Sequence, residues 1–169
     1  MKREEKNAQS RQKVLDASLR EFSAKGYDTA SINTICAEND ISKGIIYHYF
    51  KDKDEIYLLC VAECFDKLVA YMTDEVKGME GSTEQRLHGY FDVRLRFFAE
   101  NPLYLGIFTN AVLNPPDRLV GDIMAARKAF DELNISVLTR LLESTVLRKG
   151  VTVPAVVEDF RMYMDYFNM

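Results

Sequence analysis

Residues that break helices are scarce in this sequence, which has only 4 prolines and 8 glycines among 169 residues. The long segments between them are rich in Leu, Glu, Lys, Arg and Ala, which are strong helix formers. No segment approaches the roughly 18 uninterrupted apolar residues of a membrane-spanning helix, and the N-terminal MKREEKNAQS lacks the pattern of a secretory leader. Because 47% of the residues are hydrophobic, the chain can bury one sizeable core, or a small domain joined to a larger one. We therefore expect an all-α, cytoplasmic protein without membrane contact.

Cysteine and histidine are also few, which limits metal binding and catalysis. Cys36, Cys60 and Cys64 make an odd count in a chain without a leader, and this fits reduced thiols in the cytosol. Cys60 and Cys64 share a helix face and could ligate a metal, but small apolar core residues are the simpler interpretation. We therefore predict no metal and no cofactor. Because there are two histidines, no clustered acid pair in a Gly-rich setting and no nucleophile motif, we also predict that the protein is not an enzyme.

The net charge of -4, taken for the whole chain, argues against binding to nucleic acid. However, residues 1–55 carry ten Lys or Arg and ten Asp or Glu, so residues 56–169 hold the entire -4, as 12 basic against 16 acidic side chains. Basic side chains gather in residues 2–13 and again in residues 43–53. Phosphates respond to such local charge because salt screens interactions beyond about 8–10 Å. The charge distribution therefore permits DNA binding near the N-terminus without requiring it.

The N-terminal part of the chain has the pattern of a helix-turn-helix unit. A first helix is expected over residues 8–25, and Gly26 stands where a left-handed C-cap belongs. Ser31 is expected to cap a short second helix, which ends in a tight turn at residues 38–40 because Asn and Asp tolerate left-handed conformations. Ser42 can then cap another short helix. Two short helices joined by a turn after a longer one are typical of a helix-turn-helix.

The helix expected after Ser42, in ISKGIIYHYF, has two different faces. At about 100° per residue, Ile46 and Phe50 fall on one side, where they match the apolar residues of the preceding helices. The other side carries a cation, a glycine, a phenol and an imidazole, from Lys43, Gly44, Tyr47 and His48. Such a face suits a DNA major groove, because it lets the backbone approach and reaches phosphates or base edges. The alternative is that the rings are half-buried surface residues and that the glycine is accidental; the turn and the nearby lysines favour DNA.

The segment GYDTASINTICAENDISKGIIYHYFKDKDEIYLL, residues 26–59, resembles the DNA-binding domain of TetR-family transcriptional regulators. This resemblance implies phosphate contact through Lys53 and a DNA-reading surface made of Ser31, Asn33, Lys43, Gly44, Ile45, Tyr47, His48 and Tyr49. Many relatives have a small apolar residue and glycine in place of Asn39 and Asp40, so the turn is expected to differ slightly. Many also have threonine in place of Ile45, so any readout at that position is expected to be apolar, such as contact with a thymine methyl group.

The rest of the chain is expected to form further helices. Asp52 with Glu55 resembles a capping box, and Ser82 with Gln85 forms a second one. The pattern predicts helices over residues 53–76, 82–100, 102–113, 117–147 and from 154 onward. We therefore expect a helix-turn-helix DNA-binding domain at residues 1–52 and a helical domain for ligand binding and dimerisation at residues 53–169.

Aromatic and sulfur side chains recur at helical spacing in the second of these domains, and most of them are expected to fill a core. The family resemblance implies a small-molecule cavity among the central helices. The candidate lining residues are Phe65, Leu68, Met72, His88, Phe91, Arg94, Phe98, Tyr104, Phe108 and Phe130. His88, Arg94 and Arg96 are polar residues on an otherwise apolar helix, so one of them could anchor an anionic or polar ligand. Equally, Arg94 and Arg96 could simply be solvated.

Two later segments have apolar stripes that suit an interface. The first stripe is too wide for one neighbouring helix and comprises Phe130, Leu133, Val137, Leu138, Leu141, Leu142 and Val146. The second comprises Val156, Val157, Phe160, Tyr163, Met164 and Phe167. The resemblance implies that two such helices pair with their copies in a homodimer.

We therefore expect a homodimeric, ligand-responsive transcriptional regulator, most simply a repressor that a small-molecule effector releases from a palindromic double-stranded DNA operator. The alternative is a helical ligand-binding or scaffold protein whose helix-turn-helix no longer binds DNA. Retarded migration of a DNA duplex at low salt would distinguish the two.

Overall fold

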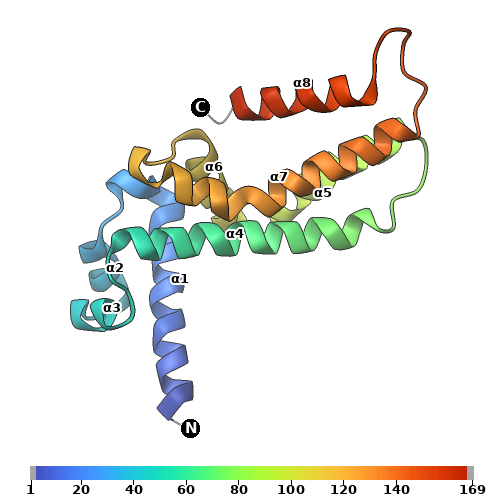
Figure 1. Ribbon diagram of the computed structural model, residues 1–169. Helices are drawn as coiled ribbons and strands as arrows, with labels where there is room; N and C mark the ends of the chain where they lie inside the picture. Colours follow the sequence, from blue (N-terminus) through green and yellow to red (C-terminus); the bar gives the residue numbers. More distant parts are fainter. Residues whose placement is uncertain (1–2, 167–169) are drawn as a thin grey trace. The chain divides into compact units, whose positions relative to one another are not determined.

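The computed structural model describes the backbone of residues 3–166 and the side chains of residues 3–162. Every regular element in this part of the chain is helical, which confirms the expected all-α class. The elements are α1 (Arg3–Thr29), α2 (Ile32–Asn39), α3 (Lys43–Tyr49), α4 (Lys53–Val76), α5 (Thr83–Glu100), α6 (Pro102–Leu113), the short 3-10 helix η1 (Asp117–Leu119), α7 (Val120–Glu143) and α8 (Val153–Tyr166) (Figure 1). None of these helices combines the length and the apolar character needed to cross a membrane.

The helices group into two compact units. The first unit holds the residues up to Cys64 together with Asn101–Ala126, and the second unit holds Phe65–Glu100 together with the residues from Arg127 onward. Both α4 and α7 are continuous helices that contribute to each unit. The functional boundary expected between residues 52 and 53 coincides with the start of α4, whereas the two units divide within α4, after Cys64. This functional boundary stays a prediction.

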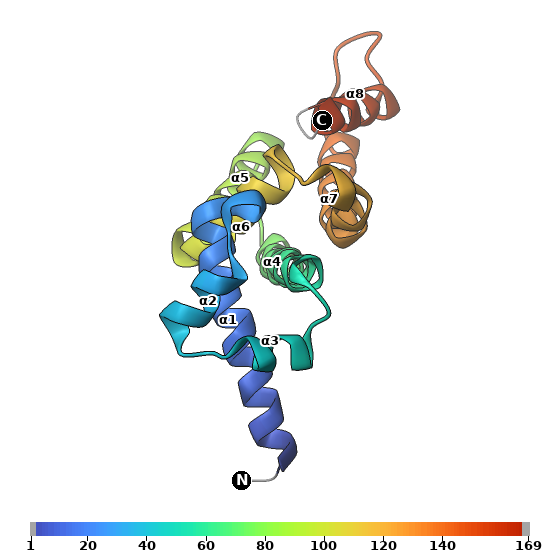
Figure 2. The same ribbon diagram turned by 90° about the vertical axis from the view of Figure 1, so that its left-hand side faces the viewer.

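In the first unit, the N-terminal helices share an apolar core. Val14 and Phe22 of α1, Ile35 of α2 and Ile46 of α3 are buried there, and Phe50 closes the core after α3. Contacts between α1 and α2, between α1 and α3, and between α2 and α3 make this a three-helix arrangement (Figure 2). Burial of these side chains is the main source of stability for α2 and α3, which are too short to persist alone.

Helix α6 packs closely against α1 in the same unit. The contact depends on Gly106, because a Cβ atom there would lie 2.5 Å from the backbone oxygen of Ser23. One turn further along α6, the Asn110 side chain donates hydrogen bonds to the backbone oxygens of Gly106, at 2.8 Å, and Phe22, at 3.4 Å. A larger residue at position 106 would therefore force the two helices apart.

Several local signals at the helix ends are confirmed, although α1 begins at Arg3 rather than at residue 8 and resumes after Gly26 to end at Thr29. Gly26 has φ 70° and interrupts α1 where a C-cap was expected, and Asp40 has φ 50° in the turn after α2. The side chain of Ser82 accepts from the Gln85 N–H at 3.2 Å, and the Gln85 side chain accepts from the Ser82 N–H at 2.9 Å, so the capping box is reciprocal. These features depend on residues a few positions apart, which is why the sequence predicts them.

The predicted C-terminal end of α7 is wrong. The helix was expected to run to Leu147 but ends at Glu143. The hydroxyls of Ser144 and Thr145 both donate to the same backbone carbonyl of α7, each at 2.8 Å. Such side-chain hydrogen bonds compete with the next backbone turn and favour a helix end. Val146 consequently lies beyond the helix and is 100% exposed, so it does not belong to the predicted apolar stripe.

The second unit is built around the inward face of α5. Tyr90, Phe97 and Phe98 are buried on this face. The second half of α4 and the greater part of α7 also contribute to the core, where the rings of Phe65 and Phe130 lie with their centroids 5.8 Å apart. The aromatic residues of this part are therefore largely core, as the sequence predicted.

Two buried tyrosines differ in how their hydroxyls are satisfied. Tyr57, in the first unit, is fully buried, and its hydroxyl has no hydrogen-bond partner among the described residues. Tyr90, in the second unit, donates to Asn134 Oδ1 at 2.6 Å, and the Asn134 amide donates onward to the Phe130 backbone oxygen at 2.9 Å. Burial raises the pKa of both phenols, that of Tyr90 to about 12, so both stay neutral at ordinary pH.

The two hydroxyls therefore predict opposite effects of the same substitution. Tyr57→Phe should raise the free energy of unfolding by about 1 kcal/mol, because it removes a polar group that was desolvated without compensation. Tyr90→Phe should lower it by about 1–3 kcal/mol, because it leaves the buried Asn134 oxygen without its donor. Urea unfolding followed by circular dichroism measures both values, and shifts of the same sign would contradict this assignment.

Candidate DNA interface and effector region

Helix α3 is held by one face while its other face stays free. Ser42 caps the helix by accepting a hydrogen bond from the Ile45 backbone N–H at 3.2 Å. Ile46 and Phe50 are buried, whereas Ile45 is 43% and Tyr47 is 55% exposed. The predicted two-faced helix is therefore confirmed, and two large apolar side chains project from its free face into solvent.

The remaining outward residues of α3 are Lys43, Gly44 and His48, all exposed. Among the described residues, a Cβ atom at Gly44 would meet only Ser42 Oγ, at an ordinary contact distance of 3.8 Å. Packing against residues 3–162 thus does not require a glycine, although glycine weakens a helix by about 1 kcal/mol relative to alanine. Close approach by an external backbone, such as a sugar-phosphate chain, would account for it.

Ser31 and Asn33 lie at the start of α2. Ser31 Oγ accepts from the Asn33 backbone N–H at 3.1 Å, and the Ser31 N–H donates to the carboxylate of the buried Glu21, also at 3.1 Å. Ser31 is therefore the predicted N-cap, and it leaves the Asn33 side chain exposed. Contact of either residue with DNA stays a prediction.

Tyr49 is the least exposed of the predicted DNA-reading residues on α3. Its hydroxyl donates to Asn7 Oδ1 of α1, and its ring packs edge-on against His48 with centroids 4.8 Å apart. This geometry ties α3 to α1 and orients His48, a role that the sequence did not reveal because Asn7 lies 42 residues away. Direct contact of Tyr49 with DNA stays a prediction.

Lys53, the predicted phosphate contact, is more confined than expected. Its Nζ atom lies 4.3 Å from the centroid of the Tyr27 ring, and burial lowers the pKa of its ammonium group. Lys51, two residues earlier, is 87% exposed and lies 3.8 Å from the Asp52 carboxylate. Lys51 is thus the freer cation beside α3, and phosphate contact through Lys53 stays a prediction.

Arg118 of η1 joins the cluster around Tyr27. Its Nε and Nη2 atoms donate to the two oxygens of Asp54 at 2.9 and 2.6 Å, while the Tyr27 hydroxyl accepts from Arg118 and donates to Asp54. These bonds, from Arg118 foremost, lower the pKa of the Asp54 carboxyl; burial and the Asp54 contact raise the pKa of Tyr27 to about 12. The cluster links the segment after α6 to the start of α4, and no local sequence pattern indicated it.

The ten candidate effector residues are distributed over both units. In the second unit, the buried candidates are Phe65, Leu68, Met72, Phe98 and Phe130, the half-buried one is Arg94, and the exposed ones are His88 and Phe91. Tyr104 and Phe108 belong to the first unit, where the Tyr104 hydroxyl donates to Glu63 at 2.8 Å. One cavity lined by all ten residues stays a prediction.

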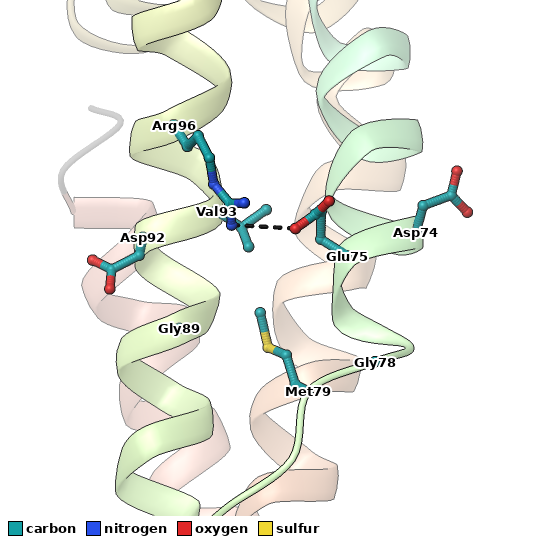
Figure 3. Close-up of a pocket in the computed structure, with 8 residues that line it drawn as sticks. All are labelled: Asp74, Glu75, Gly78, Met79, Gly89, Asp92, Val93 and Arg96. Carbon is teal, nitrogen blue, oxygen red and sulfur yellow. Dashed lines mark ion pairs between the residues drawn. The ribbon is translucent and has the colours of Figure 1, made fainter.

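A groove of about 560 Å³ lies between the end of α4 and α5 in the second unit (Figure 3). Its lining consists of Asp74, Glu75, Gly78, Met79, Gly89, Asp92, Val93 and Arg96. None of these is among the ten candidate lining residues, although Arg96 was considered as a ligand anchor. Arg96 Nη2 lies 3.2 Å from Glu75 Oε2, and the carboxylates of Asp74 and Asp92 point away from this pair. Because its cation is already paired, the groove offers no free positive charge to an anionic ligand.

Two short capped helices, joined by a tight turn and packed on a longer first helix, form a helix-turn-helix module, the arrangement typical of DNA-binding domains. Residues 14–60 match the family described as "Bacterial regulatory proteins, tetR family". Residues 14–60 therefore resemble the DNA-binding module of TetR-family regulators.

Curated relatives agree with this assignment. The chain is 32% identical over 78 residues to the HTH-type transcriptional regulator HbdR of Aromatoleum sp. (strain CIB), in an alignment that covers 46% of this chain and 34% of HbdR. It is 25% identical over 129 residues to the HTH-type transcriptional repressor KstR of Mycolicibacterium smegmatis, covering 76% of this chain and 63% of KstR. The chain thus spans between a third and two thirds of the length of these relatives.

Solved structures extend the likeness of fold beyond the N-terminal module. The transcriptional regulator FadR from Bacillus subtilis, solved in complex with stearoyl-CoA, superimposes with a TM-score of 0.71 at 17% identity, covering 92% of this chain and 83% of FadR. The TetR-family regulator PfmR from Thermus thermophilus gives a TM-score of 0.66 at 21% identity over the same shares of the chains. At such identities the likeness concerns the fold.

Proposed function

We propose that the protein is a homodimeric, ligand-responsive transcriptional repressor of the cytoplasm. Helix α3 enters the major groove of each half of a palindromic operator, and a small-molecule effector weakens that binding. The proposal rests chiefly on the outward face of α3, where exposed Lys43, Tyr47 and His48 surround a glycine that packing does not require. The regulators and repressors among its relatives support it, as does the structural neighbour that carries stearoyl-CoA.

Selection from a random duplex library, followed by gel-shift titration at several salt concentrations, tests the proposal. We expect selected duplexes to be palindromic and to bind more tightly than random DNA by a factor of about 10³ or more. We also expect affinity to fall steeply with salt, because phosphate contacts release counterions. If neither selected nor random duplexes were retarded at low salt, the proposed function would be wrong, and a scaffold role would fit the fold better.

The proposed switch depends on α4. This helix is continuous from Lys53, beside α3 in the chain, to Val76 in the second unit. We propose that an effector bound beside Phe65, Leu68 and Met72 changes the tilt of α4 and hence the spacing of the paired α3 helices. The Arg118–Asp54 ion pair also connects the segment after α6 to the start of α4.

This switch predicts reciprocal coupling. An effector that weakens operator binding by a given factor must itself be bound more weakly by the operator complex, by the same factor, which is typically about 5–150-fold. Isothermal titration of the effector into free protein and into protein saturated with operator measures the two affinities. Equal values would exclude the switch while leaving the operator binding of the free protein intact.

A further inference from the structure

Arg94 occupies an unusual position on α5. On a helical wheel it falls between Tyr90, four residues before it, and Phe98, four residues after it. Both of these side chains are buried, as is Phe97 on the same face. Arg94 therefore projects from the inward face of α5, and the second unit carries a cation within its aromatic surface.

The surroundings of this guanidinium are aromatic rather than acidic. No carboxylate of the described residues pairs with Arg94, whose guanidinium carbon instead lies 5.4 Å from the centroid of the Phe91 ring. Burial lowers the pKa of the Arg94 guanidinium, since it is partly withdrawn from water without a compensating anion from this part of the chain. An arginine keeps its charge under such conditions, because its intrinsic pKa is far above neutral.

Two other arginines of the same unit are paired with carboxylates. The buried Arg127 donates through Nε and Nη2 to both oxygens of Asp131, at 2.9 and 2.7 Å. Arg96, on the opposite side of α5, reaches Glu75 across the groove in Figure 3. Arg94 lies on the more buried side and has no such partner within residues 3–162, so packing of these residues does not explain its charge.

A half-buried charge without a partner among the described residues is unfavourable, and an incoming anion would relieve it. The planar guanidinium fork suits two parallel hydrogen bonds to a carboxylate, phosphate or sulfonate group, and the neighbouring rings suit an apolar body. We propose that Arg94 anchors the effector and that the effector is a small organic anion with an apolar or aromatic body. This inference rests on the proposed function as a ligand-responsive regulator and assigns to Arg94 the anchoring role left open among three polar residues of α5.

A matched pair of fluorescent probes tests the charge requirement. Anilinonaphthalene sulfonate and N-phenylnaphthylamine share one aromatic skeleton, and only the first carries an anion. We expect the native protein to bind the sulfonate at least about tenfold more tightly than the neutral probe. Arg94→Met should weaken sulfonate binding by about 10–100-fold, the usual range for a charge-assisted hydrogen bond, and leave the neutral probe unaffected.

Arg96→Met is the matched control, since it removes an exposed arginine that is already paired, and it should change neither affinity. A second readout does not involve a ligand: Arg94→Met should raise the melting temperature of the free protein, because it replaces an uncompensated charge by an apolar side chain. Displacement of the bound sulfonate by decanoate, decyl phosphate and decanol then separates a carboxylate from a phosphate headgroup, with the alcohol as the neutral reference.

The proposal is overturned if the native protein binds both probes equally or binds neither, or if Arg94→Met binds the sulfonate as the native protein does. Titration of selected operator DNA with the same variants separates this outcome from failure of the proposed function. Retention of operator binding by Arg94→Met, together with loss of the anion preference, supports the anchor. Absence of operator binding in the native protein refutes the repressor role without altering the probe result.

Discussion

Tyr47→Ala and Lys43→Ala should each weaken operator binding by about 10–100-fold or more, because removal of a hydrogen bond to phosphate or a base edge costs about 1–3 kcal/mol in each half-site. Neither substitution should change the free energy of unfolding by more than about 0.5 kcal/mol, since both side chains project into solvent. Fluorescence anisotropy with a selected duplex measures the first effect, and thermal unfolding measures the second. Unchanged affinity in both variants would show that α3 is not the recognition helix.

Gly44→Ala is the sharpest companion to these variants, because stability and binding should move in opposite directions. The added Cβ atom has room in the free protein, so the helix should gain up to about 1 kcal/mol. The same atom would stand between the α3 backbone and DNA, so operator affinity should fall.

Ile45→Thr should alter sequence preference more than overall affinity. Lys53→Ala should instead weaken all sequences alike and reduce the salt slope by about one unit for each phosphate that the lysine neutralises.

Local signals in the sequence were sufficient for most of the N-terminal module. The caps at Ser31 and Ser42, the left-handed Asp40 and the two faces of α3 each depend on residues within one or two turns of each other. The end of α7 was missed because apolar periodicity continues through a segment in which hydroxyl groups take over a backbone acceptor. Apolar periodicity indicates which face of a helix is buried. It does not indicate where side-chain hydroxyls bond the backbone and end the helix.

Contacts between distant residues were beyond the reach of the sequence. Arg118 lies 64 residues from Asp54 and 91 from Tyr27, and no spacing rule relates them. Likewise, the sequence could not distinguish Arg94 from Arg96 as the anchor of a ligand. In the structure, Arg96 lies 3.2 Å from the Glu75 carboxylate, whereas Arg94 has no carboxylate partner among the described residues. Confinement of Lys53 by Tyr27 was hidden for the same reason, since it requires the fold of the first unit.

The apolar stripes of α7 and α8 suggest how the proposed dimer forms. On α7, Val137 and Leu141 are buried within the chain, whereas Leu138 beside them is half-buried. Phe160 of α8 is also half-buried, together with Val156 and Val157. Tyr163, Met164 and Phe167 lie outside the residues whose side chains the structure describes. Half-buried apolar side chains on two helices of one unit are suited to pairing with a second copy.

Leu138→Glu or Phe160→Glu should therefore convert the protein to monomers and lower its affinity for a two-site operator by about 10²–10⁴-fold, because the second half-site is then no longer bound as part of one assembly. In a two-fold dimer the half-sites should lie about 34–36 Å apart, or a little more, so the loss should be specific to palindromic duplexes.

Val146→Glu is the matched control: Val146 is apolar but fully exposed beyond α7, and a charge there should leave assembly and binding unchanged. Sedimentation equilibrium gives the mass of each species, and circular dichroism shows whether the helices persist. A native protein that sediments as a monomer at micromolar concentration, yet binds a single half-site and a palindrome equally well, would exclude the dimer and leave α3 as a reader of isolated half-sites.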